Sequence, residues 1–217
     1  DFDKTLIDGY MQDPMFKEYG VDSTAFWAEN NALPKKYSEE MGIRVNPDTI
    51  YLNTFIRYAQ EKKFPGLNNE KLAQFGKKQQ FYPGIPGLFS ATKAIIEQNP
   101  QYKEYDIRVE HYIVSTGMAA VIRGTEINQY VSGIWGCEFI ESEDVSGERL
   151  ISEVAYTIDN TTKTKAIFEI NKGVGIIDDV DVNTSIPDEL RRVPFENMIY
   201  IADGPSDIPA FSVVNGR

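Results

Sequence analysis

The chain has 217 residues, a formal net charge of −11, one cysteine and one histidine. This length allows one sizeable hydrophobic core and a smaller accessory domain, and the composition is typical of soluble globular proteins. The acidic balance disfavours nucleic acid as a partner, because sequence-independent binding needs lysine and arginine at the phosphates. The apolar runs are too short to span a bilayer, so no membrane partner is expected. The lone Cys137 excludes an internal disulfide, and the lone His111 disfavours a Ser-His-Asp or Cys-His site.

The first predicted elements are a short acidic segment and a helical region. The chain begins "DFDKTLID", and residues 13–81 then carry the capping residues, prolines and spacing of helices within 22–42, 46–65 and 68–80. Tyr51, Phe55 and Tyr58 fall at helical spacing and predict a small aromatic core for this region. The pattern breaks at Pro83 and Gly84, and a further helix then returns the chain toward a sheet.

Two short apolar runs, residues 112–114 and 198–202, are typical of parallel strands buried on both faces. Each is followed by small polar or acidic residues and then by a helical pattern. Between them, residues 132–141 and 150–158 predict paired strands around a turn at Gly147, and residues 161–173 predict a helix. This repetition favours an α/β fold with an open parallel sheet, in which ligands bind at the carboxyl ends of the strands.

Acidic, hydroxyl and lysine side chains fall where these strands end or the following helices begin. They are Asp1, Asp3, Thr5, Ser115, Lys163, Asp203 and Asp207. Carboxylates that meet at strand ends repel one another unless a cation neutralises them, and all-oxygen ligands suit Mg²⁺. A lysine and a hydroxyl beside that metal would stabilise a transferring phosphoryl group. Taken singly, each residue is better explained as a turn, a cap or a surface position, but the combination in this order favours a phosphoryl-transfer site.

In this arrangement the chain resembles the phosphohydrolases of the haloacid dehalogenase (HAD) superfamily. "DFDKT", "IVSTG", the lysine of "KTKAI" and "ADGPSD" resemble its four motifs in order. The helical region resembles a C1-type cap, and the "YPG" return with the paired strands resembles the phosphoserine-phosphatase-like branch. The resemblance implies a Rossmann-like doubly wound parallel sheet with an inserted all-α cap. Residues 1–12 and 82–217 would form the α/β catalytic core, and residues 13–81 the helical cap.

The resemblance also implies roles for the motif residues. Asp1 would be the nucleophile and a metal ligand, and Asp3 the acid/base whose backbone carbonyl binds the metal. Ser115 and Lys163 would hold the phosphoryl group. The remaining ligands of Mg²⁺ would be Asp203 and Asp207.

Some positions depart from the pattern or leave a choice open. Ala202 and Ser206 stand where glycine and asparagine are usual, and neither change removes a ligand. Lys165 is an alternative to Lys163 in motif three. We prefer Lys163 because apolar residues four and seven positions later then face inward on the helix.

Substrate contacts are expected in motifs one and two and in the connection to the cap. The candidates are Thr5, Tyr10, Gln12, Thr116 and Gly117. Arg44 and Arg57 are candidates for a carboxylate or a second phosphate, although a solvated helix surface is the stronger interpretation. Cap closure would exclude water from the site.

The sequence therefore predicts a Mg²⁺-dependent phosphatase that hydrolyses a small phosphorylated metabolite through an aspartyl-phosphate intermediate. The aspartate at position 3 is typical of phosphatases and mutases in this superfamily, so a phosphomutase or phosphotransferase is one alternative. A catalytically silent binding protein with the same fold is another. We expect a cytoplasmic location, and we expect strands before Asp1 and after Arg217 to complete the sheet.

Overall fold

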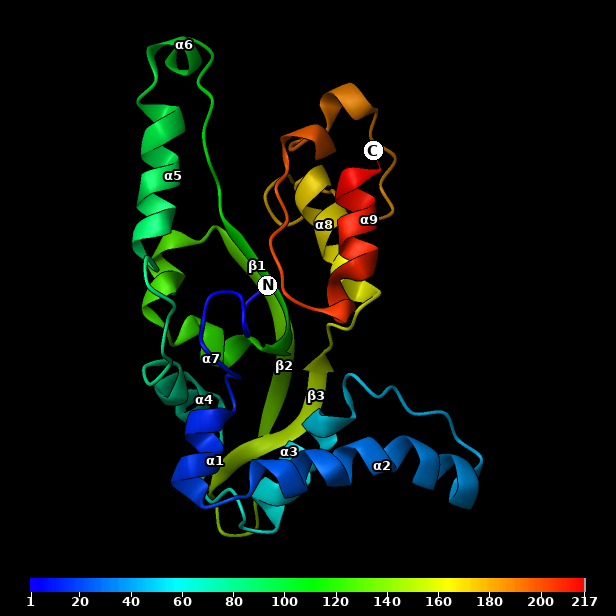
Figure 1. Ribbon diagram of the computed structural model, residues 1–217. Helices are drawn as coiled ribbons and strands as arrows, with labels where there is room; N and C mark the ends of the chain where they lie inside the picture. Colours follow the sequence, from blue (N-terminus) through cyan, green and yellow to red (C-terminus); the bar gives the residue numbers. More distant parts are fainter. Residues whose placement is uncertain (217) are drawn as a thin grey trace.

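The sheet lies in the middle of the molecule, and the helices are arranged around it (Figure 1). The computed structural model describes residues 1–216, and within them the sheet has three strands, β1 (Tyr112–Met118), β2 (Gly133–Glu143) and β3 (Arg149–Tyr156), in the order β1-β2-β3. β1 pairs parallel with β2, whereas β2 pairs antiparallel with β3. The fold is therefore mixed α/β, and the doubly wound parallel sheet predicted from the sequence is not what these residues form.

The antiparallel pair follows from its short connection. Only Asp144–Glu148 join β2 to β3, and a link of this length allows a hairpin but not a parallel crossover. The Asp144 side chain accepts hydrogen bonds from the backbone of Ser146 and Glu148, and Gly147 adopts a φ of +80° that L side chains rarely take. The predicted strand pair around Gly147 is confirmed.

The predicted strand over 198–202 is wrong for this structure. The segment is extended, but Ile199 and Ile201 are 89% and 61% exposed. Within residues 1–216 no strand pairs with it, and its link to motif one is a hydrogen bond from the Asp1 backbone nitrogen to the Ile201 carbonyl at 3.0 Å. An apolar run forms a ladder only where a neighbouring strand supplies donors and acceptors.

Four helices occupy the predicted helical region, and they lie together at the lower end of the molecule in Figure 1. They are α1 (Asp13–Tyr19), α2 (Ser23–Met41), α3 (Ile50–Gln60) and α4 (Asn69–Gly76). Asp22 caps α2 by accepting from the backbone of Thr24 and Ala25, and Gly42 ends it in the left-handed conformation. The predicted start and stop of this helix are confirmed.

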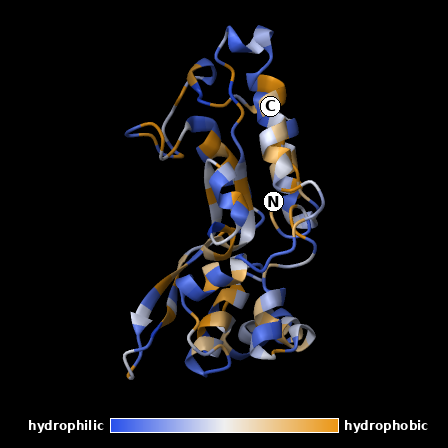
Figure 2. Ribbon diagram, turned by 90° about the vertical axis from the view of Figure 1, so that its left-hand side faces the viewer, coloured by the Kyte–Doolittle hydropathy of each residue, from blue (hydrophilic) through white to orange (hydrophobic). Residues whose placement is uncertain are grey.

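The remaining helices flank the sheet. α5 (Gly87–Glu97) and α6 (Pro100–Lys103) form an arm on one side, while α8 (Thr162–Lys172) and α9 (Ile208–Asn215) lie together on the other (Figure 1). α7 (Ala119–Arg123) follows β1 directly. Short 3₁₀ turns cover Glu126–Tyr130, Asp188–Leu190, Phe195–Asn197 and Pro205–Asp207. Coloured by hydropathy, the helices alternate between hydrophobic and hydrophilic stretches, as expected of elements that bury one face (Figure 2).

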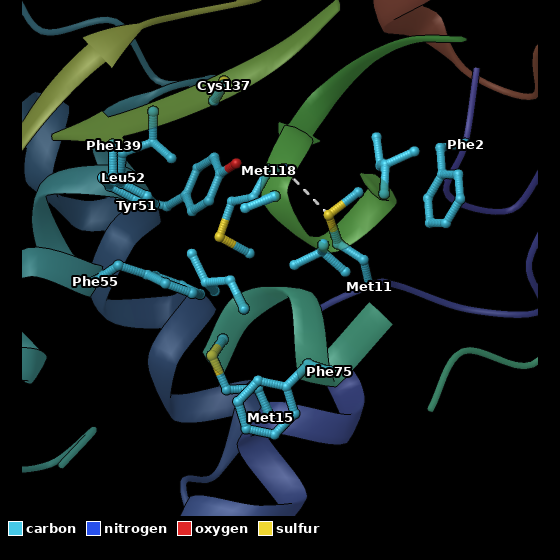
Figure 3. Packing of buried hydrophobic residues seen from close by; sticks show 14 of the residues in the cluster. Phe2, Met11, Met15, Tyr51, Leu52, Phe55, Phe75, Met118, Cys137 and Phe139 are labelled. Atoms are coloured by element: carbon cyan, nitrogen blue, oxygen red, sulfur yellow. Dashed lines mark hydrogen bonds between the residues drawn. The ribbon is translucent and has the colours of Figure 1, made fainter. Parts of the chain in front are cut away.

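One hydrophobic cluster runs from the helices α1–α4 into the sheet. Phe16, Phe26 and Phe55 of these helices belong to the same cluster as Val114 of β1 and Phe139 of β2. Figure 3 shows Phe55 on the helical side of this cluster and Phe139 on the side of the sheet. The predicted aromatic stripe is buried as expected, but its core is shared with the sheet and is not a separate one.

Small residues let α4 and α7 approach each other closely. A Cβ atom at Gly76 would lie 2.2 Å from the Val121 carbonyl oxygen, and one at Gly124 would lie 1.9 Å from that of Ala73. No side chain fits at either position without moving backbone, so this contact ties the helical region firmly to the helix after β1.

The two segments that flank α1–α4 lie antiparallel to each other. The backbone of Asp8 donates to the Gln80 carbonyl, and that of Tyr82 donates to the Leu6 carbonyl, both at 2.9 Å. Adjacent ends are expected of an inserted segment, but the division into a core (1–12 and 82–217) and a cap (13–81) stays a prediction. Across residues 1–216, no helix combines the length and apolar character needed to cross a bilayer.

Candidate active site

Lys163 lies at the centre of the candidate site. Its Nζ is 2.6 Å from Asp207 Oδ1 and 3.3 Å from Asp1 Oδ1, and all three side chains are at least nine-tenths buried. Lys163 reaches this point because α8 begins beside it. Asp159 accepts from the backbone of Thr161 and Thr162 and so fixes the first turn of the helix.

Two carboxylates contact this lysine, and the exposed Asp203 lies close to both of them. One oxygen from each of Asp1, Asp203 and Asp207 lies within 4.8 Å of the others. Such a set of oxygen donors, drawn from opposite ends of the chain, fits a hard divalent cation. Asp3, also predicted as a ligand through its backbone carbonyl, lies outside this carboxylate group.

Asp207 is held in its charged form by its neighbours. Burial by itself favours the neutral acid, but hydrogen bonds from Lys163 and Tyr200 outweigh it and hold the pKa of Asp207 below its usual range. The Tyr200 hydroxyl donates to Asp207 Oδ1 at 2.6 Å, and Ser206 Oγ is 3.2 Å from Oδ2. Sequence reasoning missed Tyr200, which was assigned to the apolar strand 198–202. The only feature of the sequence that could have indicated this role was the tyrosine hydroxyl within an otherwise apolar run.

Asp3 has a different environment. Its Oδ1 accepts a hydrogen bond from the Met11 backbone at 3.0 Å. Burial raises its pKa to about 7, a rise that the Met11 bond opposes and the nearby Asp13 carboxylate reinforces. A carboxyl group that titrates near neutral pH can both donate and accept a proton, as general acid/base chemistry requires.

The Ser115–Gly117 loop interrupts the β1 ladder next to motif one. Ser115 is buried, and its Oγ accepts from the Gly117 backbone at 3.1 Å. Met11 packs against this loop, since its sulfur lies 3.1 Å from the Met118 nitrogen (Figure 3). A Cβ at Gly117 would come within 2.6 Å of that sulfur. No hydrogen bond or ion pair connects Ser115 to the Lys163 group among the residues described.

The other predicted substrate residues are scattered around motif one. Thr5 Oγ1 and Gln12 Oε1 are buried without a hydrogen-bond partner in the described part of the chain. Tyr10 is 44% exposed, with the Lys4 ammonium 4.3 Å from its ring centre. It borders an open cavity of about 610 Å³ whose lining includes Asp13 and Lys78.

Three other basic residues that the sequence suggested as candidates make no contact with the carboxylate group in the described part of the chain. Lys165, the alternative for motif three, is 42% exposed and pairs with Glu169. Arg57 pairs with Glu29 and Glu61 on the surface of the helical region, and Arg44 is exposed. In this geometry Lys163, and not Lys165, contacts the carboxylates.

Comparison with known proteins gives a relative and a structural neighbour. No family model matches the chain. An uncharacterized protein of Borreliella burgdorferi is 40% identical over 225 residues, which cover 99% of this chain and 76% of that protein. Among solved structures, a HAD family hydrolase from Salmonella enterica serovar Typhi matches with a TM-score of 0.51 at 12% identity, over 82% of this chain. The chain spans 51% of that hydrolase, and the likeness shows the fold alone.

Proposed function

Because the chain belongs to the family of the uncharacterized Borreliella burgdorferi protein and has the fold of a HAD family hydrolase, we propose that it is a Mg²⁺-dependent phosphatase. Its substrate is a small phosphorylated metabolite, and its location is cytoplasmic. The observation that carries the proposal is the group of Asp1, Asp203 and Asp207, in which Asp1 and Asp207 also contact the buried Lys163. Carboxylates at this spacing require positive charge, and a phosphoryl group brought beside a cation and a lysine is stabilised by both.

The donor set fits Mg²⁺. Asp1, Asp203 and Asp207 would hold the ion with the backbone carbonyl of Asp3, since hard oxygen donors are those that Mg²⁺ prefers. When bound, the ion neutralises the carboxylates and the negative charge of the phosphoryl group.

Two carboxyl groups of the chain carry out the reaction, Asp1 as the nucleophile and Asp3 as the acid and base. An Asp1 oxygen attacks phosphorus, and the bond from phosphorus to the substrate oxygen breaks as Asp3 gives that oxygen a proton. The product of this step is an aspartyl-phosphate and a free alcohol. Asp3 next removes a proton from water, whose oxygen attacks phosphorus, releasing inorganic phosphate and restoring Asp1. The raised pKa of Asp3, about 7, suits both proton transfers.

Two further groups hold the phosphoryl oxygens in this proposal. Lys163 supplies a buried positive charge beside Asp1, and Ser115 supplies a hydroxyl from the bulge within β1. Both act by orientation and charge, and neither forms a covalent bond to the substrate.

The test is phosphate release by the purified full-length protein. We expect it to hydrolyse a generic aryl phosphate with Mg²⁺, to lose this activity in EDTA and to recover it when Mg²⁺ is restored. A panel of phosphorylated metabolites then identifies the substrate. Sugar phosphates that isomerise without releasing phosphate would indicate a mutase, and a protein that binds them without any reaction would be a silent binding protein. Hydrolysis that is unchanged in EDTA would contradict the metal site.

A further inference from the structure

The Ser115–Gly117 loop is a bulge whose backbone lacks ladder partners. Val114 pairs with Trp135 and Met118 with Cys137, so four residue steps on β1 lie against two on β2. The residues between these pairs cannot bond to β2 in the regular pattern. Because buried backbone groups need partners, this loop depends on side chains from elsewhere in the fold.

The Thr116 carbonyl obtains such partners from two elements. The Tyr51 hydroxyl, from α3, donates to it at 2.9 Å, and the Cys137 thiol, from β2, lies 3.3 Å away. Figure 3 shows the Tyr51 ring extending from its helix toward the strands that carry Met118 and Cys137. The bond therefore joins the helical region directly to the backbone between Ser115 and Gly117.

Tyr51 is itself rigidly held. Its side chain is buried, and its ring packs against Phe55 and Trp27 at centroid distances of 5.6 and 5.7 Å. The segment after α3 is tied to the hairpin, since the Ile151 backbone donates to the Leu67 carbonyl at 3.0 Å. The hydroxyl is thus presented from a fixed direction. Burial, followed by the nearby Cys137 and Asp3, raises the pKa of Tyr51 well above 10, so the donor proton is retained.

From these contacts we propose that Tyr51 is a positioning residue: its hydroxyl holds the Thr116 carbonyl and thereby sets the Ser115–Gly117 loop in the conformation that receives a phosphoryl group. The inference rests on the proposed function for its phosphoryl ligand. It assigns the helical region a direct part in shaping the phosphoryl site. If Tyr51 only filled the core, phenylalanine would replace it without effect on the loop. The effect of Tyr51→Phe on the loop can be measured.

Tyr51→Phe removes only the hydroxyl, and α3 offers a matched control. Tyr58 lies two turns later, is also buried, and its hydroxyl donates to Glu29 at 2.7 Å, with no contact to the loop. Tyr58→Phe therefore removes one hydrogen bond from the same helix and the same aromatic cluster. The two variants are expected to lose similar thermal stability.

The first readout is hydrogen exchange of the peptide that contains residues 113–121, which is measured without reference to activity. Tyr51→Phe should speed exchange at Gly117 and Met118 by about fivefold, the change expected from one neutral hydrogen bond, and Tyr58→Phe should leave it unchanged. The second readout is inorganic phosphate as a competitive inhibitor of aryl phosphate hydrolysis. Tyr51→Phe should weaken phosphate binding and raise KM by about fivefold while kcat changes by less than about twofold.

The outcomes separate this inference from the proposed function. If Tyr51→Phe hydrolyses aryl phosphate and matches Tyr58→Phe in exchange, phosphate inhibition and KM, Tyr51 is only a core residue and the inference is overturned. If the wild-type protein neither binds nor releases phosphate, the proposed function fails, and with it the phosphoryl role of this loop. Faster loop exchange together with weaker phosphate inhibition, in Tyr51→Phe alone, supports the inference.

Discussion

Replacing Lys163 with methionine tests how strongly the buried ion pairs of the site contribute to the fold. The Lys163 and Asp207 side chains are 1% and 0% exposed and lie 2.6 Å apart. Removing one partner of a buried ion pair costs about 3–5 kcal/mol, because the charge left behind loses its compensation. Asp207 keeps its hydrogen bonds from Tyr200 and Ser206. We therefore expect the lower end of that range, a loss of about 3 kcal/mol in the free energy of unfolding.

Urea denaturation followed by circular dichroism measures this loss. The buffer contains EDTA, since a bound divalent cation would compensate for the missing charge. Lys165→Met is the matched control on the same helix. Its pair with Glu169 at 3.2 Å is partly exposed and screened by solvent, so its loss should cost about 1 kcal/mol or less. If both variants lose the same stability, the account of Lys163 as the central buried charge is wrong.

Two further predictions concern the Ser115–Gly117 loop within β1 and the cysteine beside it. Gly117→Ala should lower the free energy of unfolding by about 2 kcal/mol, because its methyl group would meet the buried Met11 side chain; Gly87→Ala, whose Cβ would meet no atom within 4 Å, should have little effect in the same urea titration. Burial raises the pKa of Cys137 to about 11, so iodoacetamide near pH 8 should modify the denatured chain and leave the native thiol intact. Equal losses for both alanine variants, or rapid alkylation of the native protein, would contradict these two accounts.

Local signals in the sequence were enough for several helices and for the hairpin. Asp22 and Gly42 bound α2 because capping chemistry depends on the residues at the helix ends. The turn at Gly147 was predictable because glycine readily adopts the positive φ that this turn requires. The segment 198–202 was not, because an apolar run becomes a strand only through a partner elsewhere in the chain, and neither composition nor periodicity contains that information.

The candidate site shows the same division. The order of the motifs was enough to place Asp1, Lys163 and Asp207 together, although more than 200 residues separate the first from the last. Tyr200, which bonds to Asp207, and Tyr51, which bonds to the Thr116 carbonyl within β1, act through tertiary contacts made by single hydroxyls. In the sequence those tyrosines are indistinguishable from other aromatic residues of an apolar run or helix.

The central claim is that Asp1 is the nucleophile of a phosphatase. The most direct measurement compares phosphate release from an aryl phosphate by the full-length wild-type protein and by Asp1→Asn, both with Mg²⁺ and with circular dichroism spectra to verify folding. Replacing a carboxylate nucleophile by its amide removes the attacking charge while preserving shape, so release should fall by about 10³-fold or more with the fold unchanged. A folded Asp1→Asn protein that retains activity within about fivefold of wild type would contradict the claim.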